Sequence, residues 1–454
     1  MAILGIAVAA VLLFLVAAAV GRLVYIRPQR GLLLLAALVP LNGLLVLLPL
    51  PGLASAWKEG LLLATAGCAW SRSSRPDPRR PTLHAPYWPA ALGLILFGSA
   101  SALIAFGVLG VVAIKVTFFY LAIVVILWWA PFDARDRDNL VTILMSMAAF
   151  TSIVGLVQLV VGPGVLVGIG YEYGTQVRTA GGLLRTFSTF NQPFPFGLYV
   201  MLGLLVGGAV ALAEPRRRRN AVFLALTPVM VIGMASSVVR AAILGLVVGL
   251  CWLAIRRHRQ LGIGLIAAGA AIAVALPLLP SKITGTFLSS SSLGERGAGW
   301  NDIIASIVVH PLGTGLGASG AAADRMSTAS GHEFSGLSTN YQPDNYYVKM
   351  LLELGPIGLW LFLAMIVTAL IWTTRLGDRL PGRDGALALG VSSSIVAAMF
   401  ASVVATYFEI FPIDLYFWLL LGVVGCAAAQ HESHTEHSHS DPAAVVSRPT
   451  SAKS

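Results

Sequence analysis

Blocks of about 20 apolar residues alternate with short polar segments along most of the chain, and a helix of that length crosses the hydrocarbon core of a bilayer. The pattern predicts spans at residues 1–25, 31–49, 60–70, 140–161 and 194–213, with two more inside 88–131. Further spans are expected at 221–235, 238–255, 261–280 and 346–373, followed by two closing spans. The sequence therefore predicts an all-α, polytopic transmembrane bundle of about 12–13 spans, one of which, in the first 70 residues, is alternatively re-entrant.

Positive charges between the blocks assign the two sides of the membrane, because cytoplasmic loops carry an excess of Lys and Arg. The clusters are Arg22, Arg27 and Arg30, the run SRSSRPDPRR from Ser71, Arg216 to Arg219, and RRHR from Arg256. The polar segments 162–193 and 281–345 then lie outside, as a large extracytoplasmic loop region. We expect one membrane domain over residues 1–430 and a disordered, histidine-containing cytoplasmic tail over 431–454.

Composition supports a membrane protein and excludes other classes. Only 11 % of the residues are charged and 57 % are hydrophobic, so the chain cannot cover a soluble globule. The net charge of +10 comes from arginines that punctuate apolar blocks, which excludes a nucleic-acid partner because no basic stripe is formed. The three cysteines each lie in an apolar block, and no disulfide framework or zinc pattern is visible.

Three arginines on the expected outer side are the first candidates for chemistry. Arg240 lies in SSVVRAAILGL near the outer end of a span, and Arg178 and Arg185 lie in the outer segment QVRTAGGLLRTF. A charge at membrane depth usually faces a partner or a wet cavity, although Arg240 could instead snorkel to the interface. Converging guanidinium groups would suit a phosphate or pyrophosphate, which arginine binds in a bidentate manner.

The segment NYQPDNYYVKMLLELGPIGL supplies a candidate base. Asp344 directly precedes a span, where it could cap the helix or act as a general base for a hydroxyl nucleophile. Glu353 is expected to pair with Lys349, four residues earlier. The string GTGLG from Gly313 lacks a preceding strand, so we interpret it as a set of tight turns and not as a dinucleotide site.

Four segments together resemble the O-antigen ligase and polymerase superfamily of bacterial envelope glycan assembly. They are RTFSTFNQPFPFGLYV from Arg185, SSVVRAAILGL around Arg240, the run from Arg296 through Trp300 to HPLGTGLG, and DNYYVKMLLELGPIGL from Asp344. The resemblance implies a glycosyltransferase-C-like helical bundle in the bacterial cytoplasmic (inner) membrane. It also implies metal-independent transfer, without a cofactor, from a glycan linked to undecaprenyl pyrophosphate, to a glycan or lipid acceptor on the outer face.

The resemblance also implies roles for individual residues. Arg185 and Arg240 would grip the departing pyrophosphate, and Asp344 would be the base. Ligases carry a histidine at the place of Asp344, so the aspartate favours a repeat-unit polymerase over a ligase. The supporting substrate-binding residues would be Arg178, Arg296, Lys58 and Asn345, and the alternative bases would be His332 and Glu333. Other envelope polysaccharide assembly proteins are the expected protein partners.

Two rival functions remain open from the sequence. A flippase for lipid-linked oligosaccharides would also need about 12 spans and a cationic cavity, but such transporters usually show an internal repeat, which this sequence lacks. A noncatalytic envelope scaffold would not need cations on the outer side.

Overall fold

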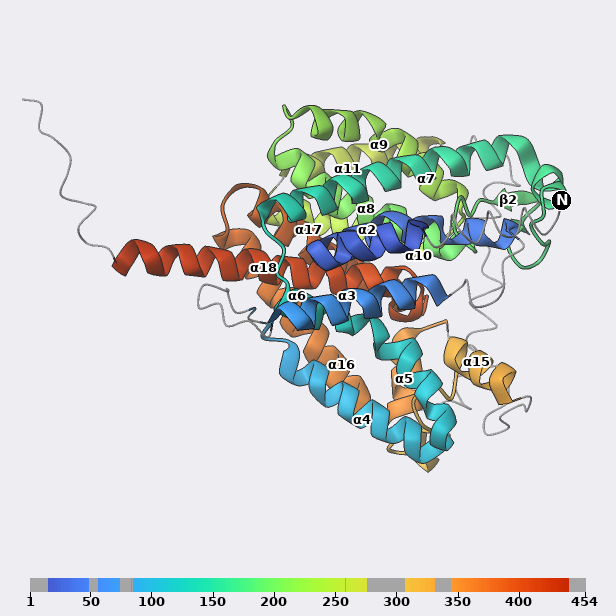
Figure 1. Ribbon diagram of the computed structural model, residues 1–454. Coiled ribbons are helices and arrows are strands. Elements are labelled where there is room, and N and C mark those ends of the chain that lie inside the picture. Colours follow the sequence, from blue (N-terminus) through green and yellow to red (C-terminus); the bar gives the residue numbers. More distant parts are fainter. Residues whose placement is uncertain are drawn as a thin grey trace, which may run out of the picture.

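The computed structural model describes residues 15–48, 56–73, 83, 85–257, 259–275, 307–330 and 344–440, and these form a bundle of helices with one short hairpin (Figure 1). Eight of the described helices are long and apolar enough to cross a membrane. The prediction of an all-α polytopic membrane protein is therefore confirmed. The first 14 residues of the expected first span, the end of the expected span 261–280 and most of loop 281–345 lie outside the described residues.

In the first half of the chain, the helices are Leu15–Ile26, α2 (Gln29–Leu38), η1 (Val39–Leu47), α3 (Trp57–Ser73), α4 (Trp88–Phe106), η3 (Gly107–Leu109), α5 (Gly110–Phe118), η4 (Phe119–Leu121), α6 (Ala122–Trp129) and α7 (Ala134–Gly168). They are followed by strands β1 (Arg178–Ala180) and β2 (Leu183–Arg185). In the second half, the helices are α8 (Pro193–Ala213), α9 (Arg218–Ser236), α10 (Arg240–Arg256), α11 (Arg259–Ala275), α15 (Gly320–Ser330), α16 (Tyr346–Arg379), α17 (Gly382–Ala401), η6 (Tyr407–Glu409) and α18 (Ile413–Ser440).

Helices α8, α17 and the apolar part of α18 form the centre of the bundle, since nearly all of their residues are buried on every side. Small residues let these helices approach closely, as membrane helices require in the absence of a hydrophobic force between them. A Cβ added at Gly390 of α17 would lie 2.9 Å from the Cα atom of Val206 in α8. The outer helices expose large apolar side chains such as Ile104 and Val160, each 86 % exposed, which fits contact with lipid.

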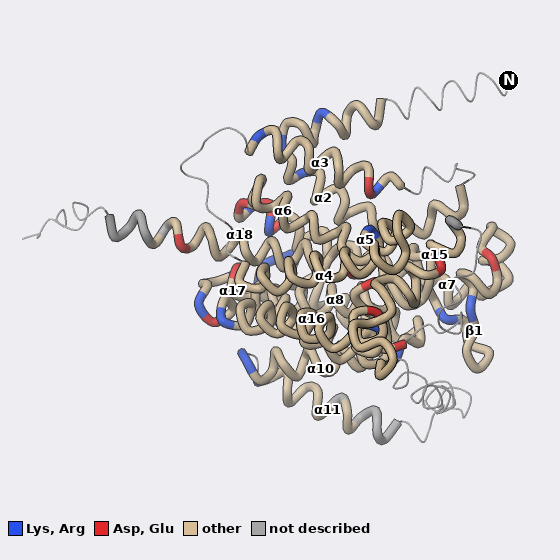
Figure 2. The backbone as a smooth tube through the Cα atoms, turned by 90° about the horizontal axis from the view of Figure 1, so that it is seen from below, with Lys and Arg blue, Asp and Glu red and all other residues tan. Residues whose placement is uncertain are grey.

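Charged residues gather at the two ends of the helices and are sparse between them (Figure 2). The loops expected in the cytoplasm meet at one end. There Arg27 Nη2 contacts Asp133 Oδ2 at 2.6 Å and Asp136 Oδ2 at 2.8 Å, and Asp133 caps α7. The hairpin, the turn between α9 and α10, and the starts of α15 and α16 lie at the opposite end, which corresponds to the expected outer side.

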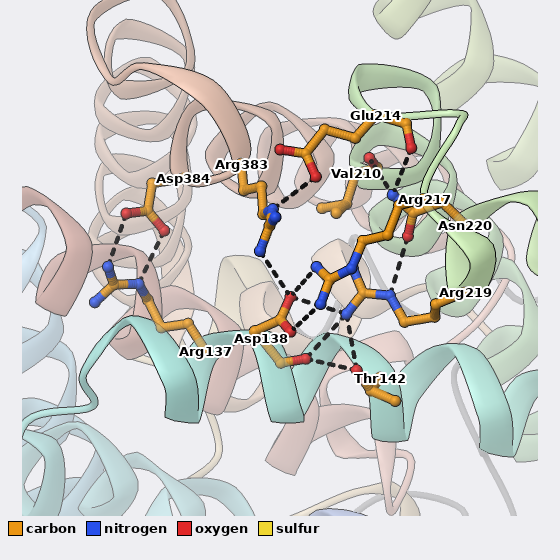
Figure 3. Close-up of polar contacts among 10 residues, drawn as sticks. All are labelled: Arg137, Asp138, Thr142, Val210, Glu214, Arg217, Arg219, Asn220, Arg383 and Asp384. Carbon is orange, nitrogen blue, oxygen red and sulfur yellow. Dashed lines mark hydrogen bonds and ion pairs between the residues drawn. The ribbon is translucent and has the colours of Figure 1, made fainter.

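A network of ion pairs at the expected cytoplasmic end is centred on Asp138 (Figure 3). Arg217 donates to both carboxylate oxygens of Asp138, at 2.8 and 2.7 Å, and Arg219 Nη1 donates to Oδ1 at 2.9 Å. Arg383 at the start of α17 lies 3.7 Å from the same oxygen and pairs with Glu214 at 2.7 Å. The network thus ties α7 to the starts of α9 and α17, and it gives two of the four consecutive arginines, Arg217 and Arg219, a structural role.

Asp138→Asn is expected to lower the free energy of unfolding by about 2 kcal/mol, because it removes a charge that several guanidinium groups share. Asp378→Asn is the matched control, since Asp378 pairs with Arg256 in a more exposed position and such pairs contribute at most about 1 kcal/mol. Denaturation of the purified protein in detergent measures both. Equal losses in the two variants would contradict a special role for the Asp138 network.

Two details differ from the sequence-based expectation. Helix α18 continues to Ser440, so the first ten residues of the predicted disordered tail are helical. Residues 441–454 lie outside the described part of the chain. In 88–131, the chain turns at Gly107, which has a φ of +57°, and α5 then packs back against α4 before α6 completes the second leg. The expected pair of antiparallel segments is present, but the second one consists of two short helices joined by a 3₁₀ turn.

Candidate functional site

A cavity of about 480 Å³ lies at the expected outer end of the bundle. Its walls come from α3, α5, the hairpin, the start of α8, α15, Asp344 two residues before α16, and the segment joining α17 to α18. Segments that are far apart in sequence therefore converge on one space. The cationic residues in its wall are Lys58, Lys115, Arg178 and Arg325, and the acidic ones are Glu59, Asp344, Glu409 and Asp414.

The β-hairpin places two of the predicted arginines side by side. Arg178 of β1 and Arg185 of β2 are partners in the antiparallel register. The strands are joined by Gly181 and Gly182, whose φ angles of +56° and +77° suit the two-residue turn that matches strand twist. Because directly opposed residues in such a pair project from the same face, the two guanidinium-bearing side chains are neighbours.

The end of the hairpin is attached to the turn that precedes α10. Thr186 N donates to Ser236 O at 3.1 Å, and Arg185 Nε donates to Ser237 O at 3.3 Å. Val238 in that turn has a φ of +53°, and Arg240 is the first residue of α10. The turn thus lies within the SSVVRAAILGL segment singled out in the sequence, and it brings Arg240 toward the hairpin.

The electrostatics of Arg185 show that these arginines form a group. Burial, together with the positive charges of Arg178 and Arg240, lowers the pKa of the Arg185 guanidinium from its usual value. Like charges held close together repel one another, and an anion bound among them would relieve that repulsion. Three guanidinium groups from two separate segments therefore form a candidate anion site.

The cation group and the cavity are adjacent but not identical. Arg178 lines the cavity, whereas Arg185 and Arg240 are not among its lining residues. The Arg185 guanidinium carbon lies 5.7 Å from the ring centroid of Phe194, and that ring is part of the cavity wall. The expectation of a single pocket containing both Arg185 and Arg240 therefore needs correction: Arg178 and Phe194 connect the arginine group to the cavity.

Of the other predicted site residues, some line the cavity and some lie outside the described part of the chain. Lys58 lines the cavity, and its Nζ lies 4.7 Å from the ring centroid of Phe411. Asp344 lines the cavity and is exposed. Arg296, and the alternative bases His332 and Glu333, lie outside the described residues.

Asn345, not Asp344, caps α16. Its Oδ1 accepts hydrogen bonds from Tyr347 N at 2.9 Å and from Val348 N at 3.2 Å. The alternative in which Asp344 caps this helix is therefore wrong, because the next residue already occupies that position. The cap uses the side-chain oxygen of Asn345, so only its amide nitrogen remains as a potential substrate ligand.

The expected pair of Lys349 and Glu353 is present and completely buried in α16. Glu353 Oε1 also accepts hydrogen bonds from Ser319 N at 2.9 Å and from Ser319 Oγ at 2.8 Å. Lys349 Nζ donates to Ser319 O at 2.8 Å and lies 3.2 Å from Glu409 Oε1. The pair thus anchors the segment before α15 to α16 and reaches the cavity wall through Glu409.

A break in α16 explains the glycine-rich string. Gly355 has a non-helical φ of +63°, and Pro356 has no N–H to donate to the carbonyl of Leu352. Thr314 N donates to Leu352 O at 2.9 Å instead, and Gly315 N donates to Glu353 O at 3.0 Å. A side chain at Gly313 would collide with this backbone, since its Cβ would lie 2.3 Å from Glu353 O. The glycines therefore allow close backbone packing, consistent with the interpretation as tight turns.

Several cavity residues were missed by sequence reasoning, namely Glu59, Lys115, Arg325, Glu409 and Asp414. Glu409 and Asp414 could have been found, because YFEIFPID places two carboxylates in the short outer turn between the closing spans. A charged residue next to an apolar block usually faces a partner or a wet cavity, and this holds for carboxylates on the expected outer side as well as for arginines. No comparable sequence signal marks Arg325, which lies on the surface of a short helix.

Comparison with known families supports the resemblance given above. Residues 223–363 match the family model described as O-antigen ligase. The matched segment runs from α9 to the middle of α16, so it includes Arg240, Arg325 and Asp344. The hairpin arginines and the segment carrying Glu409 lie outside it. A search of curated proteins finds no match to the chain.

Proposed function

We propose, from the O-antigen ligase domain that residues 223–363 carry, that this multi-pass membrane protein is a glycosyltransferase of envelope polysaccharide assembly. Its donor would be a glycan linked to undecaprenyl pyrophosphate, and its acceptor a hydroxyl group of a second glycan or of a lipid. The reaction would take place at the outer face of the bacterial inner membrane. We favour polymerisation of repeat units over ligation, because an aspartate stands where ligases carry a histidine.

The grouping of Arg178, Arg185 and Arg240 beside the cavity is the observation that carries this proposal. The pyrophosphate gains negative charge as the bond to the anomeric carbon breaks. Cations that are already positioned stabilise that developing charge without a further reorganisation cost. The hydrogen bond from Arg185 to Ser237 O and its contact with Phe194 hold one of these guanidinium groups in place before substrate binds.

Asp344 is the proposed base for the attacking hydroxyl. It lines the same cavity as Arg178 and Lys58, so a bound acceptor can reach both the carboxylate and the donor. Lys58 and Arg296 would support the diphosphate as additional cations. Metal-independent transfer remains part of the proposal, since the arginines would supply the charge stabilisation that a divalent cation supplies elsewhere.

Reconstitution of the purified protein in vesicles with a labelled undecaprenyl-pyrophosphate glycan tests the function. Elongated lipid-linked chains are the expected product. Transfer of the glycan to a different lipid or to a protein would indicate a ligase. Appearance of unchanged donor in the opposite leaflet would indicate a flippase and would contradict the proposed chemistry.

Asp344→Asn and Asn345→Ala are expected to separate catalysis from helix capping. Asp344→Asn should reduce turnover about 100-fold or more with little change in stability, because the amide cannot accept the proton. Asn345→Ala should lower the free energy of unfolding by about 1 kcal/mol, because it removes the cap of α16. Turnover in vesicles and denaturation in detergent are the two measurements. Full activity in Asp344→Asn would remove this residue from the role of base.

A further inference from the structure

The segment between α17 and α18 contributes two carboxylates to the cavity that the mechanism above does not use. Glu409 ends η6, and Asp414 lies in the first turn of α18. Both line the cavity, although the side chain of Glu409 is only 3 % exposed and Asp414 is 7 % exposed. Burying a carboxylate is costly unless its oxygens find donors, so the surroundings of Glu409 are informative.

Glu409 is incompletely satisfied by its neighbours in the described structure. Its Oε1 forms an ion pair with Lys349 Nζ at 3.2 Å, and no second described donor reaches that oxygen. Lys349 already donates to Ser319 O and is paired with Glu353. One ammonium group thus faces two carboxylates, and the guanidinium group of Arg325 on α15 also acts on Glu409. A buried carboxylate that borders a cavity and has a single close cationic partner can accept a further hydrogen bond from a ligand or from water.

The chemistry of the cavity separates two kinds of substrate. The arginine group suits the anionic diphosphate of the donor, whereas the carboxylate of Glu409 is itself an acceptor and offers no donor to a phosphate oxygen. The hydroxyl groups of a glycan carry no charge and are good donors to a carboxylate. The surface around Glu409 is therefore matched to the acceptor and not to the leaving group.

We propose that Glu409 binds the glycan acceptor by accepting a hydrogen bond from one of its hydroxyl groups, an inference that rests on the proposed function. Glu409 then contributes to acceptor affinity and orientation, while Asp344 takes the proton. Lys349 is a positioning residue in this arrangement, because it holds Glu409 in the wall through their ion pair. Loss of a hydrogen bond to a charged group corresponds to a loss of about tenfold or more in affinity.

Acceptor binding should depend on pH. Burial raises the pKa of Glu409 to about 7, and the nearby carboxylate of Glu353 acts in the same direction. Lys349 on α16 and Arg325 on α15 oppose this effect. Asp414 on α18 is the remaining carboxyl that borders the same part of the cavity. Above pH 7 the ionised Glu409 accepts a strong hydrogen bond, and as the pH falls through 7 that bond weakens.

The test measures equilibrium binding of a labelled oligosaccharide to the full-length protein in detergent. The probe is the repeat-unit oligosaccharide released from the lipid-linked pool of the producing bacterium. Glu409→Gln should weaken its binding about tenfold at pH 8 and leave undecaprenyl pyrophosphate binding unchanged. Wild-type affinity for the oligosaccharide should fall between pH 8 and pH 6, and the fall should be clearly smaller in the variant, where Asp414 is still present in the cavity wall.

Ser319→Ala is the matched control, because it removes a hydrogen bond from the same cluster without altering a cavity-lining residue. It should retain oligosaccharide binding. Equal oligosaccharide binding by wild type and Glu409→Gln, or no pH dependence in the wild type, would overturn the inference. The wild-type pH profile remains decisive if Glu409→Gln does not fold. Oligosaccharide binding that depends on Glu409 in a protein without transfer activity would contradict the proposed function alone.

Discussion

Arg240→Lys is expected to reduce glycan transfer about 100-fold without unfolding the bundle. Removing one positioned donor to a developing negative charge commonly costs a factor of about 100 to 1,000. Lysine keeps the positive charge but loses the planar, bidentate geometry that arginine offers to a phosphate. Arg240 begins α10 in an exposed position next to the hairpin, so the substitution disturbs little packing. Turnover of labelled donor in vesicles measures the effect.

Arg22→Lys provides the matched control for Arg240→Lys. Arg22 is also exposed and lies in the helix Leu15–Ile26, near its end on the opposite, expected cytoplasmic side. The Arg22→Lys variant should therefore transfer glycan at the wild-type rate. If Arg240→Lys also retained full turnover, Arg240 would have no place in the pyrophosphate site, and Arg178 and Arg185 would have to account for it.

Lys349→Met is expected to cause the largest loss of stability, about 3–5 kcal/mol in the free energy of unfolding. Methionine has a volume close to that of lysine and is one atom shorter, so the change removes the charged group and leaves little cavity. Two buried carboxylates, Glu353 and Glu409, would lose their shared cation. Denaturation in detergent at pH 8 measures the loss. The loss should be smaller at pH 5, because burial raises the pKa of Glu409 to about 7 and this carboxyl group is then neutral without its cation.

A second substitution distinguishes uncompensated charge from lost packing. Lys349→Met combined with Glu353→Gln should recover part of the stability, because one of the two stranded charges is removed. Glu353→Gln keeps the shape of the side chain and a carbonyl acceptor for Ser319. A double variant that is less stable than Lys349→Met alone would contradict the electrostatic explanation.

The membrane fold was largely predictable because its signal is local. A block of apolar residues must form a helix in lipid, where every backbone polar group needs a partner within the segment. Helix α8 (Pro193–Ala213) accordingly begins one residue before the expected span 194–213 and ends at the same residue as that span. The same blocks predicted Arg178, Arg185 and Arg240 on one side of the membrane, and the structure places them together at one end of the bundle. The helical continuation of α18 past Gln430 was not foreseen, because polar composition alone does not exclude a helix that extends a stable one.

The sequence by itself determined the class of protein and the candidate arginines, and it predicted the sidedness of the loops, since these depend on residue type and spacing within one segment. The tertiary structure decided which segments meet. It placed the hairpin on the turn before α10, gave the cap of α16 to Asn345, and brought Glu409 to Lys349 from a segment about 60 residues away. Such contacts depend on how the helices pack around α8 and α17. Close packing is decided by the fit between side chains of several helices, and the sequence of one segment does not specify that fit.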